Sequence, residues 1–307
     1  MSVDPKKWGV IYHPKAGERK VRKRWEKIKA YMDEKEVLYD YLQAEKAGDV
    51  ERLAKILAEN GYRIIVIVGG DVALNEAING IISSNAADKE SIAIGIIPNG
   101  IGNDFAQYWN IDDYKEAIDC IKEQRKRKID VGFCTFFDGQ EHQTRYFLNA
   151  VNIGLGARVV KITDQTKRFW GVKGLAYMAA LFLLIFERKL YRVHLKINGE
   201  HIRGRVMSIC VGSARGYGQT PSAVPYNGWL DVSIVFRSSF REIVHGIWML
   251  IQGRILNHKH VRIFRTQKVH VLRAQNATTD VDGRLIPRKY PLEIGIMPEK
   301  MTLIIPN

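Results

Sequence analysis

Two runs of apolar residues, each followed at once by a glycine-rich turn, constrain this chain more than any other feature. The runs are Arg63–Val68 (RIIVIV) and Ser91–Ile97 (SIAIGII), and the turns begin at Gly69 and Pro98. Continuous β-branched runs of this length are typical of parallel strands that are buried on both faces. Because glycine lets a backbone approach a ligand closely, the two turns are candidate phosphate-binding loops at the carboxyl ends of these strands.

Helical patterns separate these runs, and the alternation predicts βαβ units. Apolar residues recur at helical spacing in Asp49–Glu59, and Asn60-Gly61 ends that segment. The remaining segments expected in this part are the strands Trp8–Tyr12 and Val37–Gln43 and the helices Arg19–Tyr31 and Asp71–Ile82. Strands that alternate with helices in this way indicate a parallel sheet.

The pattern changes near Ile129, after the charged stretch Lys122–Lys128 (KEQRKRK). Asn198-Gly199 predicts a hairpin turn, and Ser239 with Glu242 predicts a capping box at the start of a helix over 241–251. The expected strands are Tyr146–Asn152, Arg192–Ile197, Arg205–Gly212, Leu230–Phe236, Val261–Arg265 and Lys268–Leu272. A chain of 307 residues therefore divides into an α/β domain and a β-rich second domain.

The formal net charge of +14 predicts an anionic partner, which is a nucleic acid, an anionic membrane or a phosphorylated substrate. No nucleic-acid-binding motif accompanies the charge, so we do not expect a nucleic acid. The three cysteines are scattered and favour a reducing cytosol, and no apolar stretch of signal-peptide length begins the chain.

An apolar run, Leu175–Phe186, has 12 residues, whereas a membrane-spanning helix needs about 20. It is either a buried helix or an interfacial helix, because basic residues flank it on both sides. The basic segment Lys6–Lys35 has the same two interpretations, a solvated helix face or a surface attracted to anionic head groups.

Four motifs, in order along the chain, resemble those of the diacylglycerol kinase catalytic-domain family. That family includes bacterial lipid kinases related to sphingosine kinase, and NAD kinases are more distant relatives. The motifs are His13-Pro14-Lys15-Ala16-Gly17, Gly69 to Gly80 (GGDVALNEAING), Pro98 to Ala106 (PNGIGNDFA) and Asp282-Gly283-Arg284.

The resemblance implies a Rossmann-like parallel-sheet nucleotide domain over residues 1–129, with a return segment at 292–307. It also implies a β-sandwich-like lipid-binding domain over 130–291, with the site in the cleft between the two. The family reaction transfers the γ-phosphoryl group of ATP to a lipid hydroxyl with Mg²⁺, and such catalysis is mainly positioning and charge stabilisation.

Residue by residue, the resemblance implies a catalytic group, a nucleotide-binding group and a metal-binding group. The implied catalytic residues are Asp71, Asp282 and Arg284, and the implied Mg²⁺ ligands are Asp71, Asp104 and Asn227. The implied nucleotide-binding residues are His13, Pro14, Lys15, Gly17, Gly69, Gly70, Asn75, Glu76, Gly100, Gly102, Asn103 and Asp104.

The sequence departs from the family pattern within three of these motifs and at Asn227. Val72 replaces a glycine, and a β-branched residue there is expected to be strained if φ is positive and to narrow the phosphate approach. Ala73 and Ile101 each replace a threonine, and Asn227 replaces an aspartate that is thought to bind a structural Mg²⁺. Arg284 replaces a glutamate proposed as general base, and arginine cannot take that role.

These departures leave two hypotheses. In one, the chain is a kinase of diacylglycerol-like or sphingoid-like lipids that uses Asp71 as base and Arg284 as a clamp on phosphate charge, with weak turnover. In the other, it is a catalytically degenerate member that binds nucleotide or lipid. Asp280 is a less favoured substitute base, and a soluble kinase of the NAD type is a third hypothesis.

The partners expected are a lipid substrate and an anionic membrane surface, with a homodimer left open. The location expected from charge, cysteines and family together is the cytoplasm, peripheral to the inner face of the membrane.

Overall fold

The computed structural model describes residues 3–13, 19–46, 48–99, 103–158, 189–215, 219–252 and 254–306. The chain forms two compact units, and each is described by itself. The first unit comprises residues 1–129 and 299–307, and the second comprises residues 130–298. The chain thus rejoins the first unit at Glu299, whereas the expected return segment began at 292. The nucleotide and lipid roles of these regions stay predictions.

A parallel sheet forms the centre of the first unit, with strand order β2-β1-β3-β4 and the end of β15 beside β4. Its strands are β1 (Trp8–Tyr12), β2 (Tyr39–Gln43), β3 (Ile64–Gly69), β4 (Ala93–Pro98) and the last residues of β15 (Leu292–Ile304). Its helices are α1 (Arg19–Glu34), α2 (Asp49–Glu59), α3 (Asp71–Ile82), the 3₁₀ turn η1 (Lys89–Ser91), α4 (Asp104–Tyr108) and α5 (Tyr114–Glu123).

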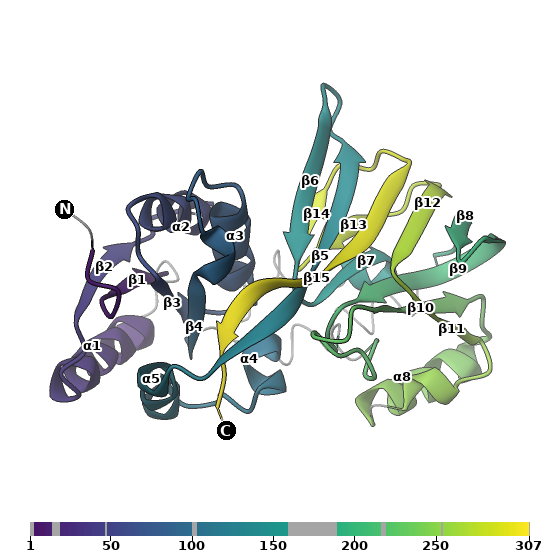
Figure 1. Ribbon diagram of the computed structural model, residues 1–307. Coiled ribbons are helices and arrows are strands. Elements are labelled where there is room, and N and C mark those ends of the chain that lie inside the picture. The colour runs from purple at the N-terminus through teal and green to yellow at the C-terminus, as the bar shows by residue number, and fades with distance from the viewer. Residues whose placement is uncertain are drawn as a thin grey trace. The chain divides into compact units, whose positions relative to one another are not determined.

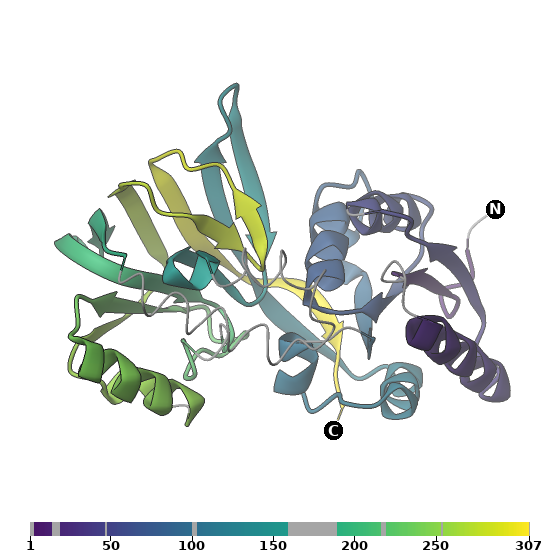
Figure 2. The same ribbon diagram turned by 180° about the vertical axis from the view of Figure 1, so that it is seen from behind.

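Helices cover both faces of this sheet, so its central strands are buried. Figures 1 and 2 both place α2 and α3 on one face, and α1 and α5 on the other. Every residue of β3 and β4 is buried, as the continuous apolar runs predicted. The fold of this unit is therefore the Rossmann-like arrangement expected from the sequence.

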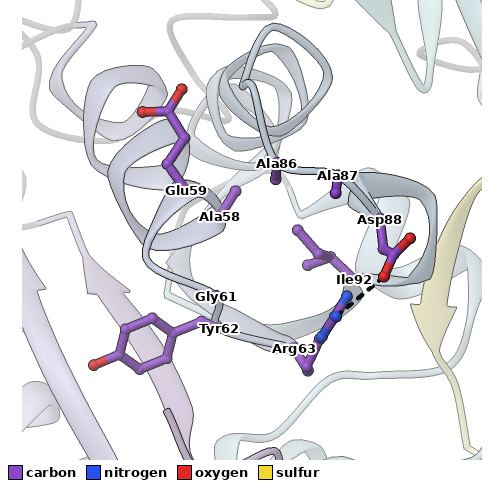
Figure 3. A pocket seen from close by; sticks show the side chains of 9 residues that line it. All are labelled: Ala58, Glu59, Gly61, Tyr62, Arg63, Ala86, Ala87, Asp88 and Ile92. Carbon is purple, nitrogen blue, oxygen red and sulfur yellow. Dashed lines mark hydrogen bonds and ion pairs between the residues drawn. The ribbon is translucent and has the colours of Figure 1, made fainter. Parts of the chain in front are cut away.

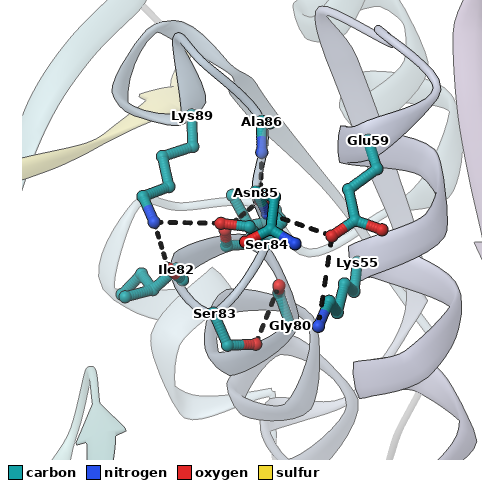
Figure 4. A network of polar contacts seen from close by, with 10 residues as sticks. Lys55, Glu59, Gly80, Ile82, Ser83, Ser84, Asn85, Ala86 and Lys89 are labelled. Carbon is teal, nitrogen blue, oxygen red and sulfur yellow. Dashed lines mark hydrogen bonds and ion pairs between the residues drawn. The ribbon is translucent and has the colours of Figure 1, made fainter.

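At the edge of the sheet where the strands begin, hydrogen bonds and an ion pair hold the ends of the neighbouring elements. At the carboxyl end of α3, Lys89 donates from Nζ to the carbonyl oxygens of Ile82 (2.7 Å) and Ser84 (3.0 Å), as Figure 4 shows. A cation at that position satisfies free carbonyl groups and complements the helix dipole. A small hollow of about 200 Å³ lies at the same edge, next to the ion pair of Arg63 and Asp88. Figure 3 shows the residues that line it.

The second unit is built from antiparallel strands. In order they are β5 (Lys126–Phe137, begun in the first unit), β6 (His142–Phe147), β7 (Ala150–Gly154), β8 (Tyr191–Ile197), β9 (Glu200–Gly212), β10 (Leu230–Phe236), β11 (Val261–Thr266), β12 (Lys268–Ala274), β13 (Thr279–Val281), β14 (Arg284–Ile286) and the first part of β15. One helix, α8 (Phe240–Ile251), and a 3₁₀ turn, η3 (Ile255–Asn257), lie between β10 and β11.

The long strand β9 links two groups of strands in this unit. Its first half pairs with β8, and its second half pairs with β7 and β10. One hydrophobic core contains residues from both groups, for example Leu195 and Val271 from one and Val151 and Val232 from the other. A core shared by two strand groups is the sandwich-like architecture that the sequence predicted.

Two local predictions can be compared with these elements. The turn at Asn198-Gly199 is confirmed, since both residues have positive φ and β8 and β9 pair on either side of it. The single strand predicted over Tyr146–Asn152 is wrong, because the structure divides it into β6 and β7.

Among the helices of the described ranges, none is both long and apolar enough to cross a bilayer. The apolar run 175–186 lies outside the described residues.

Candidate functional site

Three parallel strands of the first unit end side by side at one edge of the sheet. Gly69 at the end of β3 lies opposite Pro98 at the end of β4, and Tyr12 of β1 lies opposite Val68. His13 donates its amide to the carbonyl of Val68 (3.2 Å), and Asn99 donates its amide to the carbonyl of Gly69 (2.9 Å). The three predicted loops thus start next to one another.

Several residues of these loops lie outside the described residues, so their predicted roles remain predictions. They are Pro14, Lys15, Ala16, Gly17, Gly100, Ile101 and Gly102.

Helix α3 starts at this edge without a side-chain cap. Gly70 is its N-cap residue in extended conformation and has no side chain that could accept a hydrogen bond from the first turn. Gly69 must be glycine, because a Cβ there would lie 2.8 Å from the Cβ of Ala73. Uncapped amides at the start of a 12-residue helix offer hydrogen bonds and a partial positive charge to an anion.

Asp71 links the starts of two helices. Its carboxylate accepts hydrogen bonds from the backbone amides of Asp104 (2.9 Å) and Phe105 (3.0 Å), the first residues of α4. Asn103 makes the turn before α4 in the left-handed conformation (φ 57°), and the Phe105 side chain is fully buried. The NDFA segment therefore anchors α4 and holds it against Asp71.

This arrangement puts two carboxyl groups, those of Asp71 and Asp104, in one site. Burial, and after it the negative charge of Asp71, raise the pKa of Asp104 from 3.8 to about 6. A bound cation would stabilise the charged form of Asp104 and offset its repulsion by Asp71. Carboxylate oxygens are the donors that Mg²⁺ prefers. The residues present therefore fit a Mg²⁺ ion at this position.

Asn75 and Glu76 do not lie at the surface of this edge. Both are buried in α3, and Glu76 accepts a hydrogen bond through Oε1 from the amide of Gly48 (3.0 Å), the residue before α2. Asn79 donates from Nδ2 to the carbonyl of Asn75 (2.8 Å). These contacts hold α3 internally and against α2, and the predicted contact of Asn75 and Glu76 with a nucleotide stays a prediction.

Val72 does not strain the backbone of the turn. It lies in the first turn of α3 and is 53% exposed, and it has no positive φ. The expected backbone strain is therefore absent, since a valine is tolerated at a right-handed helical position.

In the second unit, Asp282 is almost fully buried (1% exposed). Its carboxylate accepts hydrogen bonds from the amides of Leu148 (2.7 Å), Asn149 (3.0 Å) and Ala150 (2.9 Å). These contacts bend the chain between β6 and β7, which is why the predicted strand is broken there. With φ 47°, Asp282 itself takes a left-handed turn ahead of Gly283.

Arg284 follows as an exposed residue at the start of β14. Asp280, by contrast, is fully buried, and it accepts hydrogen bonds from the amide of Gly283 (2.9 Å) and from Nδ2 of Asn152 (3.4 Å). The structure places the carboxylates of Asp280 and Asp282 inside the unit and leaves Arg284 at its surface.

The oxygen atoms around Asn227 already make contacts within the chain, and the predicted role of Asn227 as a Mg²⁺ ligand stays a prediction. Oδ1 of Asn227 accepts from the amide of Trp229 (2.9 Å), and Asp130 accepts from the amide of Gly228 (2.6 Å). The guanidinium of Arg265 pairs with Asp231 at 2.9 Å. Within the described ranges, no group of three or more His, Cys, Asp or Glu residues could hold a metal ion.

Sequence reasoning missed two residues of these regions. The amide nitrogen Nδ2 of Asn99, at the carboxyl edge of the sheet, is a buried donor without a partner among the described residues. Asp130 is buried and holds the turn at Gly228. Asn99 stands within the glycine-rich turn, which was the available signal, whereas the contact of Asp130 joins positions far apart in the chain.

Family models cover both units. The diacylglycerol kinase catalytic domain model matches residues 7–134, and the model of the YegS C-terminal NAD kinase beta sandwich-like domain matches residues 149–305. The chain belongs to the diacylglycerol kinase catalytic-domain family. The order of the motifs in the sequence had indicated this family, and the prediction is confirmed.

Individual relatives in this diacylglycerol kinase family are distant in sequence. A diacylglycerol kinase of Staphylococcus carnosus strain TM300 is 24% identical over 283 residues, which cover 89% of this chain and 87% of that protein. A diacylglycerol kinase of Staphylococcus aureus strain MRSA252 is 24% identical over 281 residues, with 89% and 84% covered.

Solved structures agree in fold with this member of the family. A structure described as a diacylglycerol kinase from Bacillus anthracis strain Sterne has a TM-score of 0.73 at 19% identity and covers 98% of this chain and 97% of that chain. Yeast NADH kinase in complex with NADH has a TM-score of 0.53 at 9% identity, with 99% and 84% covered.

Proposed function

We propose that this protein is an ATP-dependent lipid kinase that transfers the γ-phosphoryl group to a hydroxyl of a diacylglycerol-like or sphingoid-like lipid. The observation that carries the proposal is the carboxyl edge of the first unit. There an uncapped helix start lies beside the Asp71–Asp104 pair, in a chain of this kinase family. An anion site next to a cation site is what a Mg²⁺-bound triphosphate requires.

The first-turn amides of α3, with Gly69, Gly70 and Asn103, would bind phosphate oxygens. Asp71 and Asp104 would hold Mg²⁺, which neutralises charge on the phosphates when it is bound. We assign no Mg²⁺ to Asn227, because its amide oxygen is a neutral ligand, whereas Asp71 and Asp104 are carboxylates.

The proposed lipid class is supported by the relatives, which are named diacylglycerol kinases, and by the net charge of +14, which suits an anionic membrane. We further propose a cytoplasmic enzyme that acts at the inner face of the membrane.

Turnover is expected to be slow. Arg284 cannot accept a proton, and loss of positioned acid–base help typically costs 10²–10⁴-fold in rate. Asp71 lies at the carboxyl edge of the first unit, and we expect its carboxylate to orient the attacking hydroxyl.

The experiment is transfer of label from γ-labelled ATP to diacylglycerol and to sphingosine in mixed micelles. The wild type should form labelled lipid, and Asp71→Asn should form none above background. Arg284→Glu should raise the rate at least tenfold, because it restores a carboxylate at an exposed position. Absence of product from both the wild type and Arg284→Glu would contradict a kinase.

A second candidate is a protein that binds nucleotide or lipid without turnover. It is favoured by Arg284 and by Asp282, whose carboxylate is held by three backbone amides. An increase in melting temperature with Mg²⁺ and ATP, together with no labelled product, would support it over the kinase.

A further inference from the structure

Helix α8 and the strand after it lie in a strongly basic stretch of the second unit. Residues 237–265 contain six Lys or Arg residues and three His residues, and Glu242 is their single acidic residue. The basic residues are Arg237, Arg241, Arg254, Lys259, Arg262 and Arg265.

One side of α8 packs on its own unit and the other carries exposed apolar residues. Ile243 is buried and contacts Met207, with Val235 of β10 packed against the pair. Val244 (50% exposed) and Trp248 (57% exposed) lie one helical turn apart on the other side. Neighbouring large apolar residues on a solvent-exposed helix side mark a candidate interaction surface.

The neighbouring edge strand β11 extends the apolar surface. Val261 lies opposite Val235 in the sheet, so Ile263, two residues further on, is on the same face as α8. Ile263 is 47% exposed. Figures 1 and 2 both show α8 alongside β10 and β11.

The positive charge around these residues is only partly neutralised. Glu242 accepts from Lys259 (2.5 Å) and pairs with His260 (3.0 Å), so its own charge is already matched. Arg237, Arg241 and Arg254 are exposed and form no ion pair within the part of the chain that the structure describes. Arginines without an ion pair among the described residues therefore lie near the exposed apolar residues Val244, Trp248 and Ile263.

We propose that the exposed side of α8, with Ile263 of β11, docks on an anionic lipid bilayer. Tryptophan is favoured at the level of the lipid head groups, and cations beside an apolar helix side are attracted to anionic lipids. A nucleic acid would match the charge but would leave Val244 and Ile263 without a partner. The inference rests on the proposed function in one respect, which is that docking would give a lipid kinase access to its substrate. Docking itself needs no catalysis.

The test is co-sedimentation of the full chain, without ATP, with vesicles of phosphatidylcholine alone or with 30 mol% phosphatidylglycerol. The wild type should bind the anionic vesicles and bind the neutral ones at least tenfold more weakly. Trp248→Ala with Val244→Ser, and separately Arg241→Gln with Arg254→Gln, should each weaken binding at least tenfold. Trp229→Ala, which removes another exposed tryptophan of the same unit, is the matched control and should bind as the wild type does.

Three results would overturn the proposal. They are unchanged vesicle binding by the variant with Trp248→Ala and Val244→Ser, loss of vesicle binding on Lys23→Gln with Lys27→Gln in α1 instead, and binding of nucleic acid with no binding of vesicles. Circular dichroism spectra equal to that of the wild type establish that the variants are folded. Vesicle binding without lipid phosphorylation would sink the kinase proposal and leave the docking surface standing.

Discussion

At the scale of single residues, similar carboxyl groups have different roles because their surroundings differ. Asp71 and Asp104 lie together at a sheet edge and fit a cation, whereas Asp282 is enclosed by backbone amides. The motifs predicted all three as functional positions. Burial and hydrogen-bond partners, which come from distant segments, could not be predicted from the motifs.

Asp104 gives a pH-dependent prediction. Its pKa is raised from 3.8 to about 6 in the folded protein, so the folded state loses stability as pH rises from about 4 to 6. Asp104→Asn removes this cost. The variant should be more stable than the wild type by about 1–3 kcal/mol at pH 7.5 and equal to it near pH 4. Urea denaturation at the two pH values checks this, and an equal difference at both would contradict it.

Asp282 should be essential for folding stability. Asp282→Ala leaves three buried amides without an acceptor, which should cost about 3 kcal/mol or more. Asp138 is the matched control, because its carboxylate also accepts from two backbone amides, those of Gln140 and Glu141, but at the surface. Asp138→Ala should cost less than about 1 kcal/mol, since water can replace the lost acceptor. Equal losses in urea denaturation would refute the assigned role.

At the scale of helices and strands, the sequence was most informative where packing is uniform. The fully buried strands β3 and β4 and the helices α2 and α3 were predicted closely, because their patterns depend on local periodicity. The break between β6 and β7 was missed, since Asp282, more than a hundred residues away, causes it. The strand β5 was missed because it begins with the charged residues Lys126-Arg127-Lys128.

The close pair of α2 and α3 makes a prediction about Gly80. A Cβ at Gly80 would lie 2.1 Å from the carbonyl oxygen of Glu51 in α2. Gly80→Ala should therefore lower the free energy of unfolding by about 1–3 kcal/mol, because the helices are forced apart. Helix propensity alone would stabilise the variant by about 1 kcal/mol, so the sign of the change in melting temperature decides between the two effects.

At the scale of the whole molecule, the family and the architecture of both units could be predicted from the order of the motifs and the change of pattern near Ile129. Which residues of the motifs support the fold and which can meet a ligand could not be predicted. Glu76 and Asn75 belong to the first kind, and Asp71 belongs to both, because it caps α4 and lies beside Asp104.

The central claim is that the carboxyl edge of the first unit binds a Mg²⁺-bound triphosphate. Isothermal titration of ATP into the protein, with and without Mg²⁺, tests it most directly, with Asp71→Asn as the site variant and Asp138→Asn as the surface control. We predict that the wild type and the Asp138→Asn control bind ATP only when Mg²⁺ is present. Asp71→Asn should bind ATP at least tenfold more weakly. No heat of binding with the wild type, or equal affinity in Asp71→Asn, would contradict the account.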